Sequence, residues 1–539
     1  MRSFMQMFAG GWVMAALSVA VPAGSPSAET VRPNVVIILA DDLGYGDVRC
    51  YNPGGKIPTP HIDRLASEGM MFTDAHSSSG VCSPSRYALL TGRYHWRSRL
   101  QTGIVGIFGA PLIAPDRLTI AGLAKQHGYR TAAIGKWHLG WDWPISEEQR
   151  GLFQLPKGKA FGDSPSEAHL VAWREVFGKR IPGGPTTRGF DEYFGTDVPN
   201  WPPYCFIEND RTAGMPSEFL PRHLLKNHLA SAPGPALPGW ELEPILPSLG
   251  ERARDFIRRQ AGAGQSFLLY MPLTAPHTPL AVTDEWKDKS GLCSYADFVM
   301  ETDAVIGRVL GVIDAAGATD NTLVILTSDN GCAPYIGAKE MEAKGHRPSG
   351  PLRGYKGDAW EGGHREPFIV RWPRAVKAGS VCDQLVHHTD ILATLADILG
   401  APLPDNAGED SFSILPLLKG GTAPIRQHAV SCAASGIPAL RDGQWKMIAA
   451  SSGGGAFNRD PKPIEPASEV LLFNLAEDLG ETRNLAAAEP RRAAEMRAML
   501  ERLIIEGRSR PGPRQSNDVE VVRFPKPKVA GKKKGRTGG

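Results

Sequence analysis

The chain has 539 residues, of which 42% are hydrophobic and 22% are charged, and its formal net charge at pH 7 is +3. These values are ordinary for globular proteins, and a balance so near neutrality gives no reason to expect a nucleic-acid partner. The length exceeds what one small core needs, so we expect a large domain and a smaller one.

The N-terminus has the layout of a secretory signal. Arg2 precedes a mainly apolar stretch at residues 7–21, and Pro and small residues follow it. The apolar stretch is shorter than the ~20 residues of a spanning helix, which favours cleavage over a membrane anchor. We therefore expect a signal peptide at residues 1–28, an exported protein that is periplasmic or secreted, and no stable membrane insertion after cleavage. Seven cysteines would leave six to form disulfides if one serves in chemistry.

Short apolar runs rich in Val, Ile and Leu predict strands that are buried on both faces. They lie at residues 35–40, 267–271, 323–327 and 368–372. Apolar residues at three- and four-residue spacing predict helices at residues 118–127, 295–315 and 390–399. This alternation predicts an α/β fold, with a mixed, mostly parallel sheet sandwiched by helices.

The pattern of predicted strands and helices changes near residue 427. Shorter candidate strands and a final helix predict a small C-terminal α+β subdomain with an antiparallel sheet at residues 427–510. The catalytic domain would then cover residues 29–426. Residues 511–539, where Lys and Arg stand among Gly and Pro, are expected to form a basic disordered tail.

Two long loops are expected at residues 157–185 and 213–247, where Pro and Gly are frequent. Loops of this length around a site usually shape access to it. Four aromatic residues near the candidate site could stack on a sugar ring or pack in the core: Trp141, Trp143, Trp201 and Tyr204.

Polar residues follow several of the predicted strands, at the edge where parallel sheets bind ligands. Asp41 and Asp42 follow the first strand, and Asp329 and Asn330 follow the strand at residues 323–327. The others are Lys136, His138 and His277. In isolation the Asp41-Asp42 pair could equally be a turn, and a single Lys or His a solvated charge or a buried core residue.

The densest signal surrounds Cys82, in the segment Cys82-Ser83-Pro84-Ser85-Arg86. Pro84 suits the first turn of a helix because its missing N–H costs nothing there. Cys82 is therefore expected at a helix N-terminus, a position that favours anions. Taken alone, Cys82 could instead be a buried structural cysteine and Arg86 a surface cation.

Residues 82–93 resemble the signature of the type I, formylglycine-dependent sulfatases of the alkaline-phosphatase superfamily, Cys-x-Pro-Ser-Arg-x-x-Leu-Leu-Thr-Gly-Arg, and match it at every specified position. Residues 135–140 resemble the family's Gly-Lys-x-His-Leu-Gly element, residues 275–279 its Pro-His-x-Pro turn, and residues 354–363 its Lys-Gly-x-x-x-Glu-Gly-Gly element. One departure follows Gly195, where some relatives have a sulfate-contacting serine and this chain reads Thr-Asp-Val-Pro-Asn.

The resemblance implies that a maturation enzyme oxidises Cys82 to Cα-formylglycine, whose hydrated aldehyde is the nucleophile. It also implies a metal site with oxygen ligands, which suit Ca²⁺ and do not exclude Mg²⁺. Its ligands would be Asp41, Asp42, residue 82, Asp329 and Asn330.

The same resemblance suggests roles for the remaining side chains. Arg86 would hold the nucleophile, and Lys136 and Lys356 would clamp the sulfate oxygens. His277 would protonate the leaving oxygen, and His138 would take the proton whose loss expels sulfate. An extended backbone would send Lys136 and His138 to the same side.

We therefore predict a calcium-dependent sulfatase that acts on sulfate monoesters, with a sulfated carbohydrate as the preferred natural substrate and aryl sulfates as artificial ones. A phosphonate or phosphate monoester hydrolase of the same superfamily is the nearest alternative. An unmatured, non-catalytic carbohydrate-binding relative, in which Cys82 stays a thiol, is the alternative from another class.

Overall fold

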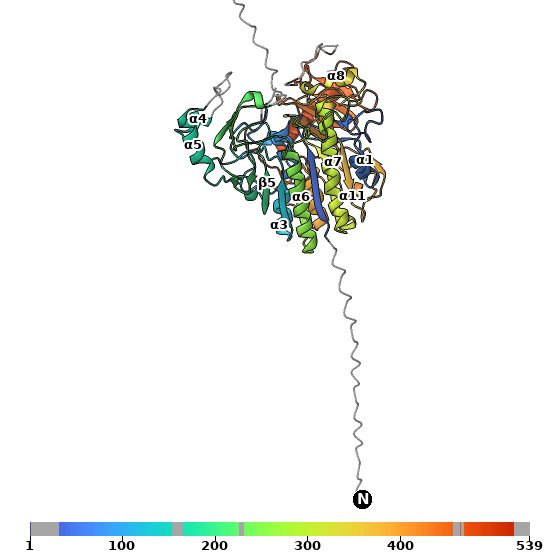
Figure 1. Cartoon of the computed structure of the whole chain (residues 1–539). Coiled ribbons are helices and arrows are strands. Elements are labelled where there is room, and N and C mark those ends of the chain that lie inside the picture. Colours follow the sequence, from blue (N-terminus) through green and yellow to red (C-terminus); the bar gives the residue numbers. More distant parts are fainter. Residues whose placement is uncertain are drawn as a thin grey trace, which may run out of the picture.

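A computed structural model describes residue 1 and residues 32–153, 165–225, 231–455, 457, 464 and 468–521 (Figure 1). Apart from residue 1, the predicted signal peptide lies outside the described residues, as do residues 522–539 of the predicted tail. Of the helices that are described, none is both long and apolar enough to cross a membrane.

A mixed sheet forms the centre of the large domain. Among the described residues its ten strands run in the order β13 (Ser380–Cys382), β2 (Met70–Phe72), β12 (Phe368–Arg371), β11 (Thr322–Ser328), β1 (Asn34–Ala40), β10 (Phe267–Pro272), β4 (Arg130–Ile134), β5 (Glu192–Gly195), β6 (Ile207–Glu208) and β7 (Arg211–Thr212). The five strands from β11 to β5 are parallel, whereas β12 and β6 run antiparallel to their neighbours. The predicted mixed, mostly parallel sheet is confirmed.

Successive residues of the central strands pack on opposite faces of the sheet. Val35, Ile37 and Leu39 belong to one hydrophobic cluster, whereas Val36 and Ile38 belong to another. Because both faces are covered, the middle of each central strand is a continuous apolar run, such as Val35 to Leu39 in β1, as in other buried parallel sheets.

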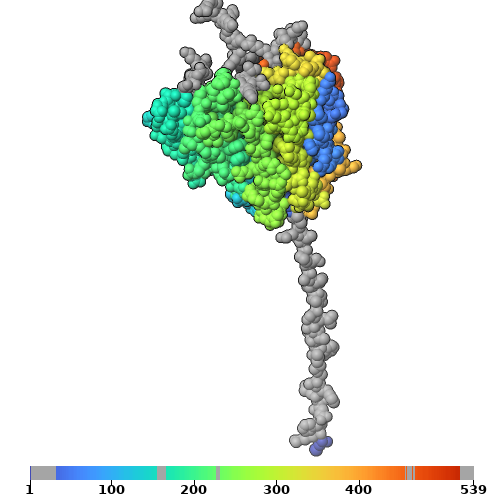
Figure 2. Space-filling view, viewed as in Figure 1, coloured from blue at the N-terminus to red at the C-terminus, as the bar shows by residue number. Residues whose placement is uncertain are grey.

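Helices cover both faces of the sheet. The first face packs against α2 (Cys82–Thr91), α3 (Ile120–Gln126) and α10 (Asp390–Leu399), and α5 (Glu167–Phe177) contributes Trp173 and Phe177 to the same hydrophobic cluster. The second packs against α1 (Pro60–Ser67), α6 (Ile245–Gly262) and α7 (Ser294–Ala315). On the surface of this second face, α1 lies beside α7 (Figure 2). Shorter helices and strands are α4 (Arg150–Phe153), α8 (Ala338–Ala343), α9 (Glu361–His364), α11 (Leu415–Leu418), β3 (Ala75–His76) and β14 (Val386–His387).

The predicted C-terminal antiparallel sheet is confirmed. Its strands are β15 (His428–Cys432), β16 (Pro438–Asp442), β17 (Trp445–Ile448) and β18 (Leu471–Asn474), and α12 (Pro490–Glu506) packs on it. The sequence analysis did not identify β16, whose polar ends Arg441 and Asp442 obscure its short apolar run. The domain boundary at residue 427 stays a prediction.

The two predicted loops contain regular structure. The described part of residues 157–185 includes α5, which Ser166 begins with a capping box to His169 and which buries Trp173. In the second, β8 (Glu218–Leu220) pairs with β9 (Gly234–Ala236), and α6 begins at Ile245. The flanking Pro and Gly residues concealed these short elements.

Residues 511–521 contact the folded domains. Arg93 Nη2 donates to Asp518 Oδ1 at 3.0 Å, and Asp518 N donates to Arg97 O at 2.8 Å. This part of the predicted tail therefore contacts the large domain, although most of its residues are exposed. All seven cysteines are free, so the structure contains none of the disulfides that six of them could have formed.

Arg97 and Asp410 form a buried ion pair that also reaches α12. Both side chains are fully buried, and Arg97 Nε and Nη2 donate to the two Asp410 oxygens at 2.8 Å each. Arg97 Nη1 donates to Leu503 O at 3.0 Å. The pair therefore joins the large domain to the C-terminal helix.

We expect Asp410→Ala to lower the free energy of unfolding by about 3–5 kcal/mol, because it leaves the Arg97 charge buried and uncompensated. Denaturant unfolding measures the change. The control is Asp255→Ala on α6, which removes an exposed partner of Arg258 and should cost at most about 1 kcal/mol. Equal, small losses in the two variants would contradict this role.

Candidate active site

The parallel register brings the polar strand ends together. Ala40 of β1 is paired with Ser328 of β11, so Asp41 and Asp329 follow directly at the same edge. Asp329 N donates to Ala40 O at 3.0 Å, and Asp42 N donates to Asp329 Oδ1 at 3.2 Å. The side chains of all three aspartates are buried. The predicted meeting of these residues is thus seen in the structure.

Cys82 is the first residue of α2, as expected, and lies within this acidic cluster. Its Sγ is 3.6 Å from Asp41 Oδ1, 3.6 Å from Lys136 Nζ and 3.8 Å from Lys356 Nζ. Burial raises the pKa of the Cys82 thiol to about 12, although the two lysines oppose the shift. The thiol is therefore neutral at physiological pH and a weak nucleophile.

Two lysines approach Cys82 from different segments. Lys136, after β4, places Nζ 2.6 Å from Asp41 Oδ2. Lys356 places Nζ 2.7 Å from both carboxylate oxygens of Asp42. Burial disfavours the charged form, but the Asp42 carboxylate, together with Cys82, Tyr335 and Asp41, outweighs it and holds the pKa of Lys356 well above its usual value. Lys356 thus stays cationic in the buried site.

Arg86, one turn after Cys82 on α2, pairs with Asp329. Its Nε and Nη2 lie 2.9 and 2.7 Å from Asp329 Oδ2, and its Nη1 donates to Lys136 O at 2.9 Å. Because the guanidinium is occupied in this way, Arg86 connects α2, β11 and the segment after β4. It is better placed to position the cluster than to approach a substrate.

His277 lies beside Asp42. Its Nδ1 is 2.5 Å from Thr278 O, which can only accept, so Nδ1 carries the proton and Nε2 faces Asp42 Oδ2 at 3.7 Å. Burial, and then the Lys356 ammonium, lower the pKa of His277 to about 4. The imidazole is therefore neutral at physiological pH in this structure.

The extended backbone expected between Lys136 and His138 is wrong. Gly135 has φ 142° and His138 has φ 53°, so the chain turns sharply there. His138 Nε2 lies 3.1 Å from Val105 O, while its buried Nδ1 has no hydrogen-bond partner among the described residues. Burial, Lys136 and Arg86 lower the pKa of His138, which leaves a neutral imidazole near the cluster.

The donor atoms that could hold a cation only partly match the predicted set. Ligand atoms of Asp41, Asp42, Cys82 and His277 lie within 4.8 Å of one another, so His277 joins the group. Asp329 lies beside this group, because its Oδ1 accepts from Asp42 N, but its Oδ2 already pairs with Arg86. Burial, and then the Asp41 carboxylate, raise the pKa of Asp329 to about 7.

Asn330 offers an oxygen for such a cation. Its Nδ2 donates to Asp42 Oδ1 at 2.7 Å, and its Oδ1 is buried without a hydrogen-bond partner in the described part of the chain. An unpaired buried carbonyl oxygen is costly unless something coordinates it. Together with three carboxylates, it makes an oxygen-rich donor set that suits a hard divalent cation.

Comparisons with known proteins agree with this geometry. Residues 33–401 match the sulfatase family model. The chain belongs to the sulfatase family. The N-acetylgalactosamine-6-O-sulfatase of Bacteroides thetaiotaomicron is 32% identical over 485 residues, which cover 87% of this chain and 93% of that protein. Human arylsulfatase A is 32% identical over 465 residues, 84% of this chain and 83% of that protein.

A solved structure described under glycosaminoglycan metabolism by Bacteroides thetaiotaomicron superimposes with a TM-score of 0.73 at 31% identity. It covers 88% of this chain and 99% of its own. The predicted family and enzyme class are confirmed, and this sulfatase is an enzyme that hydrolyses sulfate esters.

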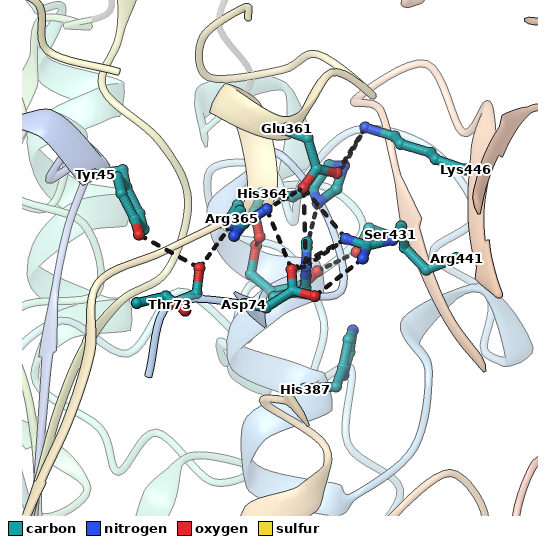
Figure 3. A network of polar contacts seen from close by, with 12 residues as sticks. Tyr45, Thr73, Asp74, Glu361, His364, Arg365, His387, Ser431, Arg441 and Lys446 are labelled. Carbon is teal, nitrogen blue, oxygen red and sulfur yellow. Dashed lines mark hydrogen bonds and ion pairs between the residues drawn. The ribbon is translucent and has the colours of Figure 1, made fainter. Parts of the chain in front are cut away.

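A second group of buried polar residues connects the sulfatase's two domains (Figure 3). Glu361, on α9, faces two cations of the C-terminal sheet. Lys446 Nζ lies 2.9 Å from Glu361 Oε1, and Arg441 Nη1 lies 3.3 Å from Glu361 Oε2. The sequence analysis noticed Glu361 only within its Glu-Gly-Gly element and missed the cations, which come from distant strands.

Two histidines also belong to this network. His76 Nδ1 lies 3.1 Å from His364 Nδ1, and ligand atoms of His76, Glu361 and His364 fall within 4.8 Å of one another. Lys446 Nζ is 3.3 Å from His364 Nε2, so an ammonium group already supplies the positive charge there. The network therefore suits a structural role better than a metal.

The network flanks two segments of the active site. β3 leads to Cys82, and α9 follows Lys356. Gly357 N donates to Gly80 O at 2.7 Å, which joins these segments directly.

Gly135 allows three strand ends to approach closely beside Lys136. A Cβ atom at residue 135 would lie 1.8 Å from Pro272 O, and one at Gly195 would lie 1.8 Å from Gly135 O. No side chain fits between these backbones without moving them.

We expect Gly135→Ala to destabilise the sulfatase by about 1–3 kcal/mol, because the backbone that carries Lys136 must move. The rate of sulfate release should fall as well, because Lys136 moves with that backbone. Gly262→Ala, on α6, is the control: nothing lies within 4 Å of its added Cβ, and it should leave activity unchanged. Denaturant unfolding and a sulfate-release assay measure the two effects, and a fully active, fully stable Gly135→Ala variant would contradict the account.

Proposed function

We propose that this sulfatase hydrolyses sulfate esters of carbohydrates with Cα-formylglycine at position 82 and with bound Ca²⁺. The observation that carries the proposal is the environment of Cys82. Its Sγ lies 3.6 Å from Lys136 Nζ and 3.8 Å from Lys356 Nζ, at the first residue of α2 and 3.6 Å from Asp41 Oδ1. Residue 82 thus stands between candidate metal ligands and the cations that would bind a sulfate group, which is the position that a nucleophile needs.

The donor set supports a calcium ion. Asp41, Asp42, Asp329 and the unpaired Asn330 Oδ1 would hold it, and magnesium is not excluded by ligand type. The formylglycine hydrate would supply a hydroxyl nucleophile. The ion, when bound, would act as a Lewis acid and polarise that hydroxyl.

The two lysines are suited to bind the sulfate group. A sulfate ester is an anion, and negative charge spreads over its oxygens in the transition state. Lys136 and Lys356 both carry their ammonium groups close to residue 82, where each pairs with an aspartate. Arg86, locked on Asp329, keeps α2 and β11 in position.

The two histidines are suited to move protons. His138 is neutral with a buried Nδ1 that accepts no hydrogen bond from the described residues, which suits a proton acceptor. His277 is also neutral here, so to protonate a leaving oxygen it must first gain a proton. The negative charge of a bound sulfate ester raises a nearby imidazole pKa and favours that step.

The comparisons support a carbohydrate substrate, because one relative acts on N-acetylgalactosamine 6-sulfate by name and the superimposed structure is described under glycosaminoglycan metabolism. The N-terminal sequence supports export to the periplasm or the outside. A formylglycine-generating enzyme would be the maturation partner.

We expect Cys82→Ala to lower kcat/KM by at least roughly 10³-fold, because it removes the nucleophile. Cys82→Ser should be equally inactive unless the serine is itself converted. The measurement is hydrolysis of matched aryl sulfate, phosphate monoester and phosphonate monoester by protein coexpressed with the maturation enzyme. Preference for the phosphorus esters, or unchanged activity of Cys82→Ala, would sink the proposal.

We also expect Ca²⁺ added to chelator-treated enzyme to raise its stability, by about 2.7 kcal/mol at a free concentration one hundred times Kd. Asn330→Ala removes one oxygen ligand and should weaken this response. Asn406→Ala, in an exposed loop, should leave it unchanged. Thermal unfolding with Ca²⁺ and with Mg²⁺ provides the readout, and identical calcium responses in wild type and Asn330→Ala would contradict the ligand assignment.

A further inference from the structure

The four aromatic residues near the active site fall into two groups. Trp141, Trp143 and Tyr204 are buried within the hydrophobic clusters that cover the sheet. Their packing accounts for their presence. Trp201 is different, because its side chain is partly exposed.

The indole of Trp201 packs on a catalytic-site histidine. Its ring centroid lies 5.6 Å from that of His138, with the two planes at 84°. His138 is the imidazole beside Lys136 and Arg86 in the buried charge cluster. Trp201 thus borders the active site while keeping part of its surface exposed.

The loop that carries Trp201 is held on both sides. Before it, Asp197 O accepts from His138 N at 3.1 Å. Next to it, Asn200 O accepts from Ala232 N at 3.0 Å and from the Tyr204 hydroxyl at 2.8 Å. The indole is therefore presented by a pre-organised backbone, which lowers the entropy cost of using it to bind a ligand.

We propose that Trp201 is a specificity-determining residue whose indole packs against the sugar ring that carries the sulfate group. This inference rests on the proposed function. With the sulfate held by Lys136 and Lys356, the esterified sugar extends out of the charge cluster past its bordering side chains. A pyranose ring has an apolar face of C–H bonds, and an indole offers a large, rigid surface to pack on it.

The test compares wild type, Trp201→Ala and Trp201→Phe in the hydrolysis of N-acetylgalactosamine 6-sulfate and galactose 6-sulfate. Trp201→Ala should raise KM for the sugar sulfate roughly three- to tenfold, as expected for one lost aromatic contact, with little change in kcat. Trp201→Phe should restore most of the affinity. Competitive inhibition by inorganic sulfate should be unchanged in both, because that anion lacks the sugar.

Trp445→Ala is the matched control, since it removes an indole from the C-terminal sheet and should leave KM unchanged. Unchanged KM in Trp201→Ala would overturn the inference. So would a fall in kcat with a weakened inhibition by sulfate, which would mean that Trp201 only supports His138.

Failure of the proposed function shows in the wild type instead. Release of sulfate from an aryl sulfate but from neither sugar would exclude the carbohydrate class, and this inference with it, before any variant is compared.

Discussion

Three carboxylates and three cations are buried together at the carboxyl ends of β1 and β11. Asp41 pairs with Lys136, Asp42 with Lys356 and Asp329 with Arg86, and all six side chains are nearly inaccessible to water. A buried charge without a partner would cost several kcal/mol, so each of these residues depends on the others. The rest of the fold can be understood as the framework that keeps the six in register.

The six residues of this cluster come from five separate parts of the chain. The parallel pairing of β1 with β11 sets Asp41 beside Asp329, and α2 brings Cys82 and Arg86 to them. The close approach at Gly135 places Lys136. The network around Glu361 holds the segments that contain Lys356 and Cys82 through contacts with the C-terminal sheet. That sheet therefore contributes to the site without contacting the reacting position itself.

Much of this could be predicted from local sequence. Asp41 and Asp329 follow buried apolar runs, and the carboxyl ends of parallel strands share one edge, so their meeting needs no long-range information. Pro84 placed Cys82 at a helix start for an equally local reason. The relative orientation of Lys136 and His138 could not be obtained this way, because His138 adopts a left-handed conformation, which is uncommon outside glycine and which the strand pattern does not indicate.

Residues that act through distant neighbours were beyond local reasoning as well. Arg441 and Lys446 look like ordinary strand residues until the fold brings them to Glu361. Likewise, Trp201 could not be separated from Trp141 by sequence, since burial alone distinguishes the core side chain from the one on the site border.

The chemistry proposed for this framework depends on the state of residue 82. Mass spectrometry of the peptide that contains it, from fully active enzyme coexpressed with a formylglycine-generating enzyme, tests that state most directly. The account predicts that the thiol has been replaced by an aldehyde, in a proportion that tracks the specific activity of each preparation. An unmodified cysteine thiol at residue 82 in fully active enzyme would contradict it.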